Sequence, residues 1–533
     1  MKDSDPLLTD TGRGFSILYK GRHLYSNTDP KKNAVIKAER AILQGDTLYF
    51  LSSPLLFYGI KELISKLPPS SHIICFELSE SLHSLSKKYF QDLTFNSQLI
   101  SFIDSTDPAS IFNKINDLGI WNFRRVKALN ITGGYSLHSL EYKSILMSLD
   151  NRIQEYWKNR ITLIHMGPLW IKNIFINLSK KKYSSKFSQF PEIECPILVT
   201  GAGESLENSI EFIKKQRHFF KILAVDTSIS VLLENGIEPD YVIAVDAQIY
   251  NFFDFLKVKN KKIPLFFDIT GYPGIPNIMN GNIYPFISNF TDTKLFERLE
   301  SYKLLPTILP ALGSVGVSAV HLALKLTGGN VYYTGLDFSY KIGKSHANGS
   351  PRNLSELTIS NRLNPMEQPD IYYARPLIYN KDKTGLNCIS DLVLNSYAEL
   401  MNTSFQKNER LVDIGISGLN SGGQLINTKD ISFVNKCNKG KNIENTIDTN
   451  HKTNFFKFCN NEITLLNKLY DTIFSYLSGD STKSDLVIKL LKETDYIYIH
   501  FPDKSPEPTL DSGFLKRILI SCGYYINILK KHT

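Results

Sequence analysis

The sequence predicts an α/β protein whose centre is a Rossmann-like domain built on a parallel sheet. Short apolar runs alternate with helical segments over residues 47–150 and 196–350, glycine-rich turns follow two of these runs, and acidic residues stand where runs end. Strands that alternate with helices form βαβ units, and βαβ units build parallel sheets. Because the chain has 533 residues, we expect several domains of about 100–200 residues each.

Four regions are expected along the chain. Residues 1–150 carry a strand at 47–51, a helix at 55–67 and a second strand at 72–76, which predict an N-terminal Rossmann-like domain. Glu77 follows the second strand, but the turn before the helix lacks a glycine pair, so we favour a structural role for this domain. Long amphipathic stretches predict a helical linker at 151–190. A second α/β domain at 191–430 and a mainly helical C-terminal domain at 431–533 complete the chain.

Composition narrows the class of protein. Apolar residues make up 42% and charged residues 21% of the chain, as in ordinary globular proteins. Lys and Arg exceed Asp and Glu by 61 to 52, an excess too mild for a nucleic-acid binder. We find neither a signal peptide nor a run of about 18 apolar residues, so we predict no membrane partner and a cytoplasmic location. The six cysteines lack metal-binding spacing and are expected to be reduced thiols.

The first glycine-rich turn follows an apolar strand at 196–200 and precedes a helix at 207–217. Gly201 and Gly203 let the backbone turn sharply and approach a ligand without Cβ clashes. The helix N-terminus offers free amides to a phosphate, and Ser205 can cap the helix or donate to the ligand. A plain structural turn is the alternative interpretation of the same residues.

Two aspartates follow the next two strands of this domain. Asp226 ends a strand at 222–225, and Asp246 ends a strand at 240–245. Ligands of parallel α/β sheets bind outside the carboxyl ends of the strands, so both aspartates and the glycine turn should share one edge. Carboxylates there can hold ribose hydroxyls, a base amino group or a divalent metal. Each aspartate alone could equally be a helix cap.

A second turn of small residues contains Gly313 and Ser314 and leads into a helix at 319–327. Small residues at a helix start permit close approach of a ligand, and they equally permit close packing on a sheet. The next strand, at 331–334, is followed by Asp337 and then by His346 in a polar, glycine-flanked loop. A histidine beyond a strand end can act as a general acid, a general base or a phosphate ligand.

The order of these motifs resembles the motility accessory factor family. The matching segments, in sequence order, are GAGESL, LAVDTS, PDYVIAVDAQ, LGSVGVSAVHLALKLTGG, TGLDFSY and SHANG. The family shares a domain with archaeal 6-hydroxymethylpterin pyrophosphokinases, and its motif order is similar to that of bacterial sialyltransferases. The resemblance covers most of the chain and is specific for about residues 191–350. It implies a sialyltransferase-like domain at 191–430.

The resemblance also implies an enzyme. A cytoplasmic glycosyltransferase of this family would move a nonulosonic acid from a CMP-activated donor onto Ser or Thr of flagellin, a step required for flagellar assembly. No metal or further cofactor is implied. His346 and Asp337 are the candidate catalytic residues. The candidate nucleotide-binding residues are Gly201, Gly203, Ser205, Asp226, Asp246, Gly313 and Ser314.

Two other functions stay open at this point. An ATP-dependent transfer of diphosphate to a pterin alcohol would use Asp226 and Asp246 to bind Mg²⁺ between the phosphates. A flagellin-binding accessory protein without catalytic activity is the non-enzymatic alternative. The sequence identifies neither the sugar, the acceptor residues, the general base nor the oligomeric state.

Overall fold

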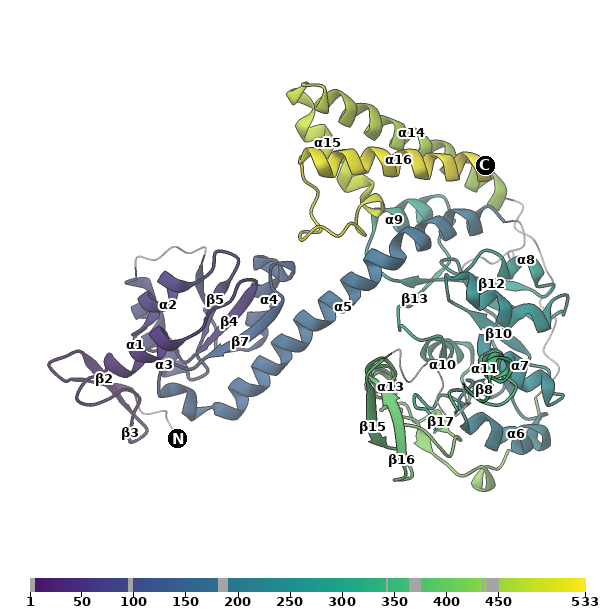
Figure 1. Cartoon of the computed structure of the whole chain (residues 1–533), viewed down its shortest axis with the longest axis horizontal. Coiled ribbons are helices and arrows are strands. Elements are labelled where there is room, and N and C mark those ends of the chain that lie inside the picture. Colours follow the sequence, from purple (N-terminus) through teal and green to yellow (C-terminus); the bar gives the residue numbers. More distant parts are fainter. Residues whose placement is uncertain are drawn as a thin grey trace. The chain divides into compact units, whose positions relative to one another are not determined.

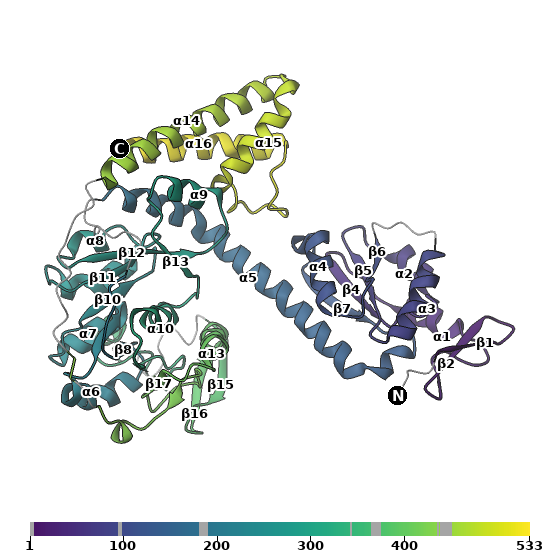
Figure 2. The same ribbon diagram turned by 180° about the vertical axis from the view of Figure 1, so that it is seen from behind.

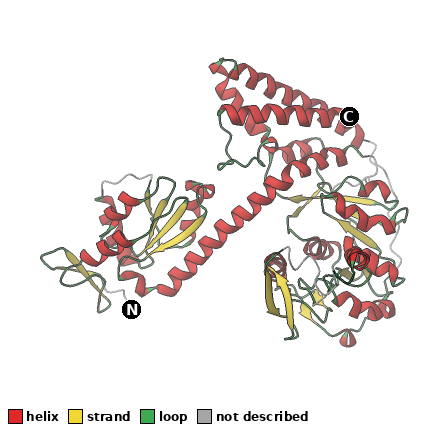
Figure 3. Cartoon of the chain, in the orientation of Figure 1, coloured by secondary structure: helices red, strands yellow, loops and turns green. Residues whose placement is uncertain are grey.

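A computed structural model describes residues 5–93, 99–180, 190–341, 344–363, 375–433, 436–437 and 450–533. The chain divides into two compact units (Figure 1). The first unit is Met1–His165 with Ile499–Pro508, and the second is Met166–Tyr498 with Thr509–Thr533. Both units contain strands and helices, and the last part of the chain is helical (Figure 3). The predicted α/β class is therefore confirmed.

The first unit contains a four-stranded parallel sheet in the order β6-β5-β4-β7 and a small antiparallel sheet of β1, β2 and β3. β4 and β5 are buried along their whole length, as expected for parallel strands covered on both faces. The strands are β1 Leu7–Asp10, β2 Phe15–Tyr19, β3 Arg22–His23, β4 Thr47–Ser52, β5 His72–Phe76, β6 Ile100–Phe102 and β7 Arg125–Leu129. The helices are α1 Lys32–Arg40, α2 Ile60–Lys66, α3 Glu80–Gln91 and α4 Ala109–Leu118.

The turn between β4 and α2 differs from the prediction. The helix expected from residue 55 begins only at Ile60, because Leu55 and Phe57 have φ angles of 53° and 58°, which a right-handed helix does not contain. Glu77 lies beside this turn, is 1% exposed, and accepts hydrogen bonds from Ser53 Oγ at 2.5 Å and Tyr142 Oη at 3.2 Å. The Glu77 carboxylate therefore links this turn, through Ser53, to Tyr142 on the following long helix.

The predicted helical linker is a single long helix. α5 runs from Ser139 to Leu178 and contains Pro168. It begins before the expected start at residue 151, and it contributes residues up to His165 to the first unit and residues from Met166 to the second. Residues 181–189 of the expected linker lie outside the described residues.

The second unit is built on a nine-stranded sheet whose neighbouring strands are all parallel (Figure 2). The strand order is β13-β12-β11-β10-β9-β8-β14-β17-β18. The chain leaves β8 in one direction along the sheet and returns to pair β14 with the other side of β8. This reversal is a topological switch point, where ligands of open α/β sheets bind.

The strands predicted at 196–200, 222–225, 240–245 and 331–334 are present, whereas no elements were predicted for residues 247–310. The strands are β8 Ile197–Thr200, β9 Lys221–Val225, β10 Tyr241–Ala244, β11 Leu265–Asp268, β12 Ile283–Asn289, β13 Thr307–Pro310, β14 Val331–Thr334, β17 Leu411–Asp413 and β18 Gln424–Leu425, with a separate hairpin of β15 Leu377–Lys381 and β16 Asn387–Asp391. The helices are α6 Ser205–Gln216, α7 Asp226–Glu234, α8 Ile275–Ile278, α9 Lys294–Ser301, α10 Val315–Leu326, α11 Pro351–Ile359 and α13 Leu392–Phe405. A 3₁₀ helix, η3, spans Ile249–Val258. α10 packs its apolar residues on the central strands and forms much of the core.

The C-terminal helices are α14 His451–Leu477, α15 Ser484–Glu493 and α16 Ser512–His532, which confirms the predicted helical end of the chain. A buried ion pair joins α14 to α9. Arg298 binds both carboxylate oxygens of Glu462 at 2.9 Å, and Tyr496 Oη donates to the same carboxylate at 2.8 Å. Glu462 is only 2% exposed, so these partners compensate for its buried charge.

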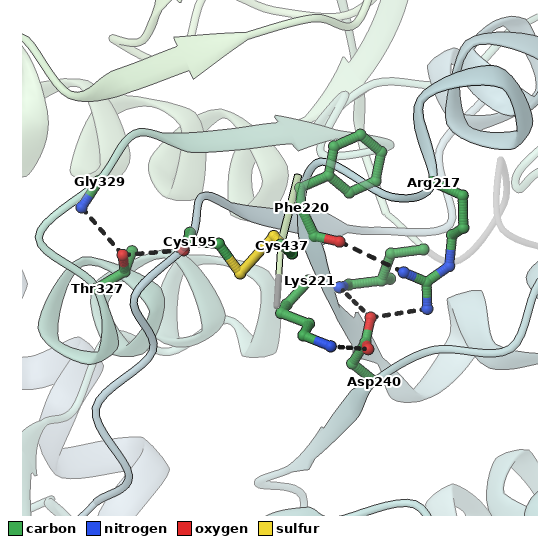
Figure 4. Close-up of a disulfide and its surroundings, with 9 residues drawn as sticks. Cys195, Arg217, Phe220, Lys221, Asp240, Thr327, Gly329 and Cys437 are labelled. Carbon is green, nitrogen blue, oxygen red and sulfur yellow. Dashed lines mark hydrogen bonds and ion pairs between the residues drawn. A yellow bond between two sulfur atoms is a disulfide. The ribbon is translucent and has the colours of Figure 1, made fainter. Parts of the chain in front are cut away.

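A disulfide joins Cys195, just before β8, to Cys437 (Figure 4). The two Cα atoms lie 5.6 Å apart although 242 positions separate the residues in sequence. Cys437 N also donates to the carbonyl of His218 at 2.8 Å, and nearby Phe433 stacks on Phe219. The expectation of reduced thiols is therefore wrong for these two cysteines, because a contact between such distant residues leaves no local motif.

Loss of this disulfide is expected to destabilise the second unit by about 2–4 kcal/mol, because the cross-link restricts the unfolded chain. Urea unfolding of the wild-type chain with and without reductant, and of Cys437→Ser, measures the effect. Cys388→Ser is the matched control, since Cys388 is a partly exposed free thiol. Identical unfolding midpoints for wild-type protein in oxidising and reducing buffer would show that the cross-link contributes nothing.

Candidate functional site at the carboxyl edge of the sheet

The residues predicted from sequence follow the carboxyl ends of β8, β9, β10, β13 and β14. Since these strands are parallel, their ends share one edge of the sheet, which we call the rim. β8 and β14 are neighbours, so the loops after them meet at the switch point. The common edge predicted for the glycine turn and the two aspartates is thus present.

The glycine turn after β8 packs directly against the loop after β14. Gly203 N donates to the carbonyl of Gly335 at 2.8 Å. A Cβ on Gly201 would lie 2.3 Å from that carbonyl oxygen, and one on Gly203 would lie 2.6 Å from Asp337 Cγ. Both glycines are therefore required for close approach of the two loops, which is the packing function that the sequence left open.

Asp337 occupies the N-terminus of α6. Its carboxylate accepts hydrogen bonds from Ser205 N at 2.8 Å and from Ser205 Oγ, and both residues are buried. Burial raises the pKa of Asp337 to about 6, although the hydrogen bonds from Ser205 oppose this change. The carboxylate uses the helix-end amide that a phosphate would otherwise meet. The catalytic role of Asp337 and the nucleotide contact of Ser205 stay predictions.

A buried lysine that the sequence analysis missed lies next to this loop. Lys383, at the tip of the β15–β16 hairpin, forms an ion pair of 2.5 Å with Asp413, and their side chains are 6% and 3% exposed. The backbone N of Lys383 donates to the carbonyl of Gly418. Gly418 in turn packs against Asp337, since a Cβ on Gly418 would lie 2.5 Å from Asp337 Cα. The hairpin is therefore anchored beside the switch point by a largely buried charge pair.

The loop that carries His346 lies against the glycine turn. Ala347 N donates to the carbonyl of Ala202 at 2.7 Å. Lys344 forms an ion pair of 2.5 Å with Glu207 in the first turn of α6. The structure therefore brings together the loops after β8 and β14, which the sequence analysis placed at one edge.

The hydrogen bonds of His346 define its tautomer. Ser345 Oγ donates its single hydrogen to Glu356 Oε1 at 2.9 Å, and His346 Nδ1 lies 3.1 Å from the same Oγ. Nδ1 must therefore carry the hydrogen in this contact, which leaves Nε2 of the neutral ring as a proton acceptor. Burial lowers the pKa of His346, while Glu356 opposes that effect. The neutral form consequently predominates at pH 7.

Asp226 and Asp246 lie close together at the rim. Asp226 is 4% exposed and accepts hydrogen bonds from Asn251 Nδ2 at 2.6 Å and from Thr227 N at 2.8 Å. Burial raises the pKa of Asp226, and the charge of Asp246 adds to this effect. Asp246 is exposed, and among the described residues its carboxylate accepts a single hydrogen bond, from Gln248 N at 3.2 Å. Asp246 can therefore receive hydrogen bonds from a ligand.

Gly313 and Ser314 immediately precede α10. The helix begins at Val315, four residues before the predicted start, and no described side chain caps it. Gly313 is exposed with a φ of 66°, and a Cβ there would lie 3.1 Å from the ring of Tyr397. The charge of Asp246 contributes to the raised pKa of Tyr397, so this tyrosine lies close to both features. The helix end thus presents free amides near Asp246.

η3 contributes two polar groups that the sequence analysis did not identify. Asn251 binds Asp226, as described above. Asp254 is 9% exposed, and burial together with the charges of Asp226 and Asp246 raises its pKa to about 7. A carboxyl group with such a pKa in a cluster of charges is a candidate functional group. Its sequence context, an apolar segment interrupted by Asp, gives only a weak signal.

Among the residues that the structure describes, no three side chains of His, Cys, Asp or Glu are arranged to hold a metal ion. Within the same ranges, no helix combines the length and apolar character needed to span a bilayer.

The parallel sheet, with a glycine turn at its switch point and helices between its strands, defines the second unit as an α/β domain with a large parallel sheet. Residues 170–343 match the family described as 6-hydroxymethylpterin diphosphokinase MptE-like. The chain therefore carries an MptE-like domain, which extends from the last turns of α5 to the loop of His346.

The fold of the whole chain is that of a motility accessory factor. It is similar to the MAf glycosyltransferase from Magnetospirillum magneticum AMB-1, with a TM-score of 0.60 and 14% identity, over 99% of this chain and 90% of that one. An uncharacterized protein of Treponema pallidum (strain Nichols) is 24% identical over 99% of this chain and 95% of its own length. A second uncharacterized protein of that organism is 31% identical over 22% of this chain and 60% of its own length. The resemblance noted in the sequence is confirmed.

Proposed function

We propose that the chain is a glycosyltransferase that moves a nonulosonic, sialic-acid-like sugar from a CMP-activated donor onto Ser or Thr of flagellin. The observation that carries the proposal is the convergence of loops at the rim of a fold shared with a MAf glycosyltransferase. The His346 loop is bonded to the glycine turn, and the uncapped start of α10 lies near Asp246. The proposed reaction takes place in the cytoplasm and needs no metal or further cofactor.

The rim offers groups suited to each part of the donor. Asp226 and Asp246 would accept hydrogen bonds from the ribose hydroxyls or the cytosine amino group. The free amides in the first turn of α10, which Gly313 and Ser314 precede, would bind the phosphate through the positive end of the helix dipole. These contacts would place the bond between sugar and phosphate beside the His346 loop.

Sugar transfer forms a bond between the acceptor oxygen and the anomeric carbon while the bond from that carbon to the phosphate oxygen breaks. CMP leaves with the electron pair of the broken bond. A bound phosphate would raise the pKa of His346, so that protonated Nε2 could donate a hydrogen bond to the leaving oxygen. Hydrogen-bond donors placed at the atom where negative charge develops in the transition state lower the activation barrier most.

The match of residues 170–343 to the 6-hydroxymethylpterin diphosphokinase MptE-like family favours a second candidate function, the transfer of diphosphate from ATP to a pterin alcohol. In that reaction Asp226 and Asp246 would bind Mg²⁺ between the phosphates. The same rim would then hold ATP instead of CMP. The two functions differ in the nucleotide and in their need for a divalent cation.

Intact-mass analysis tests the proposed function. Purified chain is incubated with flagellin and a CMP-activated pseudaminic or legionaminic acid, and the expected result is a mass gain of whole sugar units with release of CMP. A parallel reaction contains ATP, Mg²⁺ and 6-hydroxymethylpterin. Unmodified flagellin together with AMP formation would favour diphosphate transfer, and flagellin binding without affinity for either nucleotide would favour an accessory protein.

A further inference from the structure

The residues of η3 fall into three stripes, because a 3₁₀ helix repeats every three residues. Phe255 and Val258 are buried and Phe252 is half-buried, whereas Tyr250, Phe253 and Leu256 are exposed. The third stripe is polar and faces α7; its members are Asn251, Asp254 and Lys257.

The two outer members of the polar stripe have partners on α7. Asn251 Nδ2 donates to Asp226 Oδ2 at 2.6 Å at the start of the helix, and Lys257 Nζ pairs with Glu234 Oε1 at 2.6 Å at its end. Asp254 lies between them, is 9% exposed, and makes no hydrogen bond or ion pair with any residue in the described ranges. Beside it, the Oδ1 atom of Asn251 is buried and has no partner there.

A carboxyl group that is mostly buried and has no hydrogen-bond partner in the described part of the protein is costly, even where its oxygens reach solvent, and calls for an explanation. The charged groups on the elements around Asp254 do not provide one. Asp226 on α7 and Asp246 after β10 repel it, while Glu234 and Lys257 neutralise each other. Asp254 is therefore held against two carboxylates by the packing of η3, which points to a use in binding or chemistry.

We infer that Asp254 is the general base that takes the proton from the acceptor hydroxyl in sugar transfer. The inference rests on the proposed function, in which His346 serves the leaving phosphate and a separate group must activate the acceptor. As the acceptor oxygen bonds to the anomeric carbon, its hydrogen moves to the Asp254 carboxylate and CMP departs. Asp226 and Asp246 would hold the nucleotide within reach of this carboxylate.

Asp254→Asn tests this role, because the amide keeps the shape of the side chain and removes the base. We expect sugar transfer to fall about 100- to 10,000-fold, while the affinity for CMP is unchanged. In the wild-type chain kcat should rise with pH through an apparent pKa near 7, and this inflection should be absent from the residual activity of the variant. Asp471→Asn, an exposed position on α14, is the matched control.

A second readout is independent of activity. Burial and two neighbouring charges raise the pKa of Asp254 from its ordinary value of 3.8 to about 7, so its ionisation destabilises the folded chain progressively as pH rises between these values. Asp254→Asn should therefore raise the melting temperature at pH 8 and have little effect on it near pH 4. A variant that is more stable but less active than the wild-type chain is the result expected when a functional group lowers the stability of the folded protein.

Three outcomes would overturn the inference, and they are distinguishable. An unchanged transfer rate in Asp254→Asn removes the base role directly. Loss of CMP affinity along with transfer makes Asp254 a binding residue instead. Absence of transfer and of CMP binding in the wild-type chain contradicts the proposed function itself, and the role of Asp254 with it.

Discussion

Replacing Lys383 by methionine is expected to destabilise the second unit by about 3–5 kcal/mol, because it leaves a carboxylate buried without its counter-charge. Lys383 and Asp413 are 6% and 3% exposed and lie 2.5 Å apart. Burial already raises the pKa of Asp413, and the lysine is the main opposing influence. Urea unfolding followed by tryptophan fluorescence or circular dichroism measures the change.

The double variant Lys383→Met/Asp413→Leu is the decisive control. Replacing both members of a buried ion pair by apolar residues is often neutral, so stability should return to near the wild-type value. A double variant as unstable as the single one would show that the lysine acts through packing of the hairpin. If Lys383→Met were as stable as the wild-type chain, Lys383 would not be compensating the buried charge of Asp413.

His346→Ala is expected to lower sugar transfer by about 100- to 10,000-fold while the chain stays folded. The histidine is only partly buried, and its one described hydrogen-bonding contact is with Ser345, so its removal costs little stability. The variant should have a lower kcat with little change in KM, because the ring is proposed to stabilise the negative charge that develops on the leaving phosphate. The released CMP is the measured quantity.

An exposed histidine provides the matched control for this variant. His218 contributes its backbone carbonyl to Cys437, so His218→Ala keeps that contact and should transfer sugar at the wild-type rate. Ser345→Ala, which removes the partner of Nδ1, should cause a smaller loss than His346→Ala. A normal rate for His346→Ala would remove this residue from the site.

Much of the fold follows from local sequence patterns. Continuous apolar runs bounded by glycine and aspartate predicted β8, β9, β10 and β14 to within a residue or two, because strands buried on both faces leave no other pattern. Other features depend on the folded chain. The positive φ angles of Leu55 and Phe57 delay α2, and the pairing of Cys195 with Cys437 spans 242 positions.

The candidate site shows the same division. Asp226, Asp246 and Gly313 were predicted because each follows a strand, and parallel strands end at one edge. The contact of Asp337 with Ser205 and the burial of Lys383 were not predictable, because they join residues 132 and 30 positions apart through tertiary packing. Asp254 could not be recognised in the same way, because the residues of a 3₁₀ helix repeat every three positions and match neither the strand nor the α-helix pattern.

Titration calorimetry with nucleotides tests the central claim, that the rim binds a CMP-activated sugar. The account predicts that CMP binds the wild-type chain without a divalent cation and that Asp246→Ala, at an exposed position, weakens binding about 10- to 100-fold through loss of a charged hydrogen bond. Binding of ATP that requires Mg²⁺, with no affinity for CMP, would contradict it.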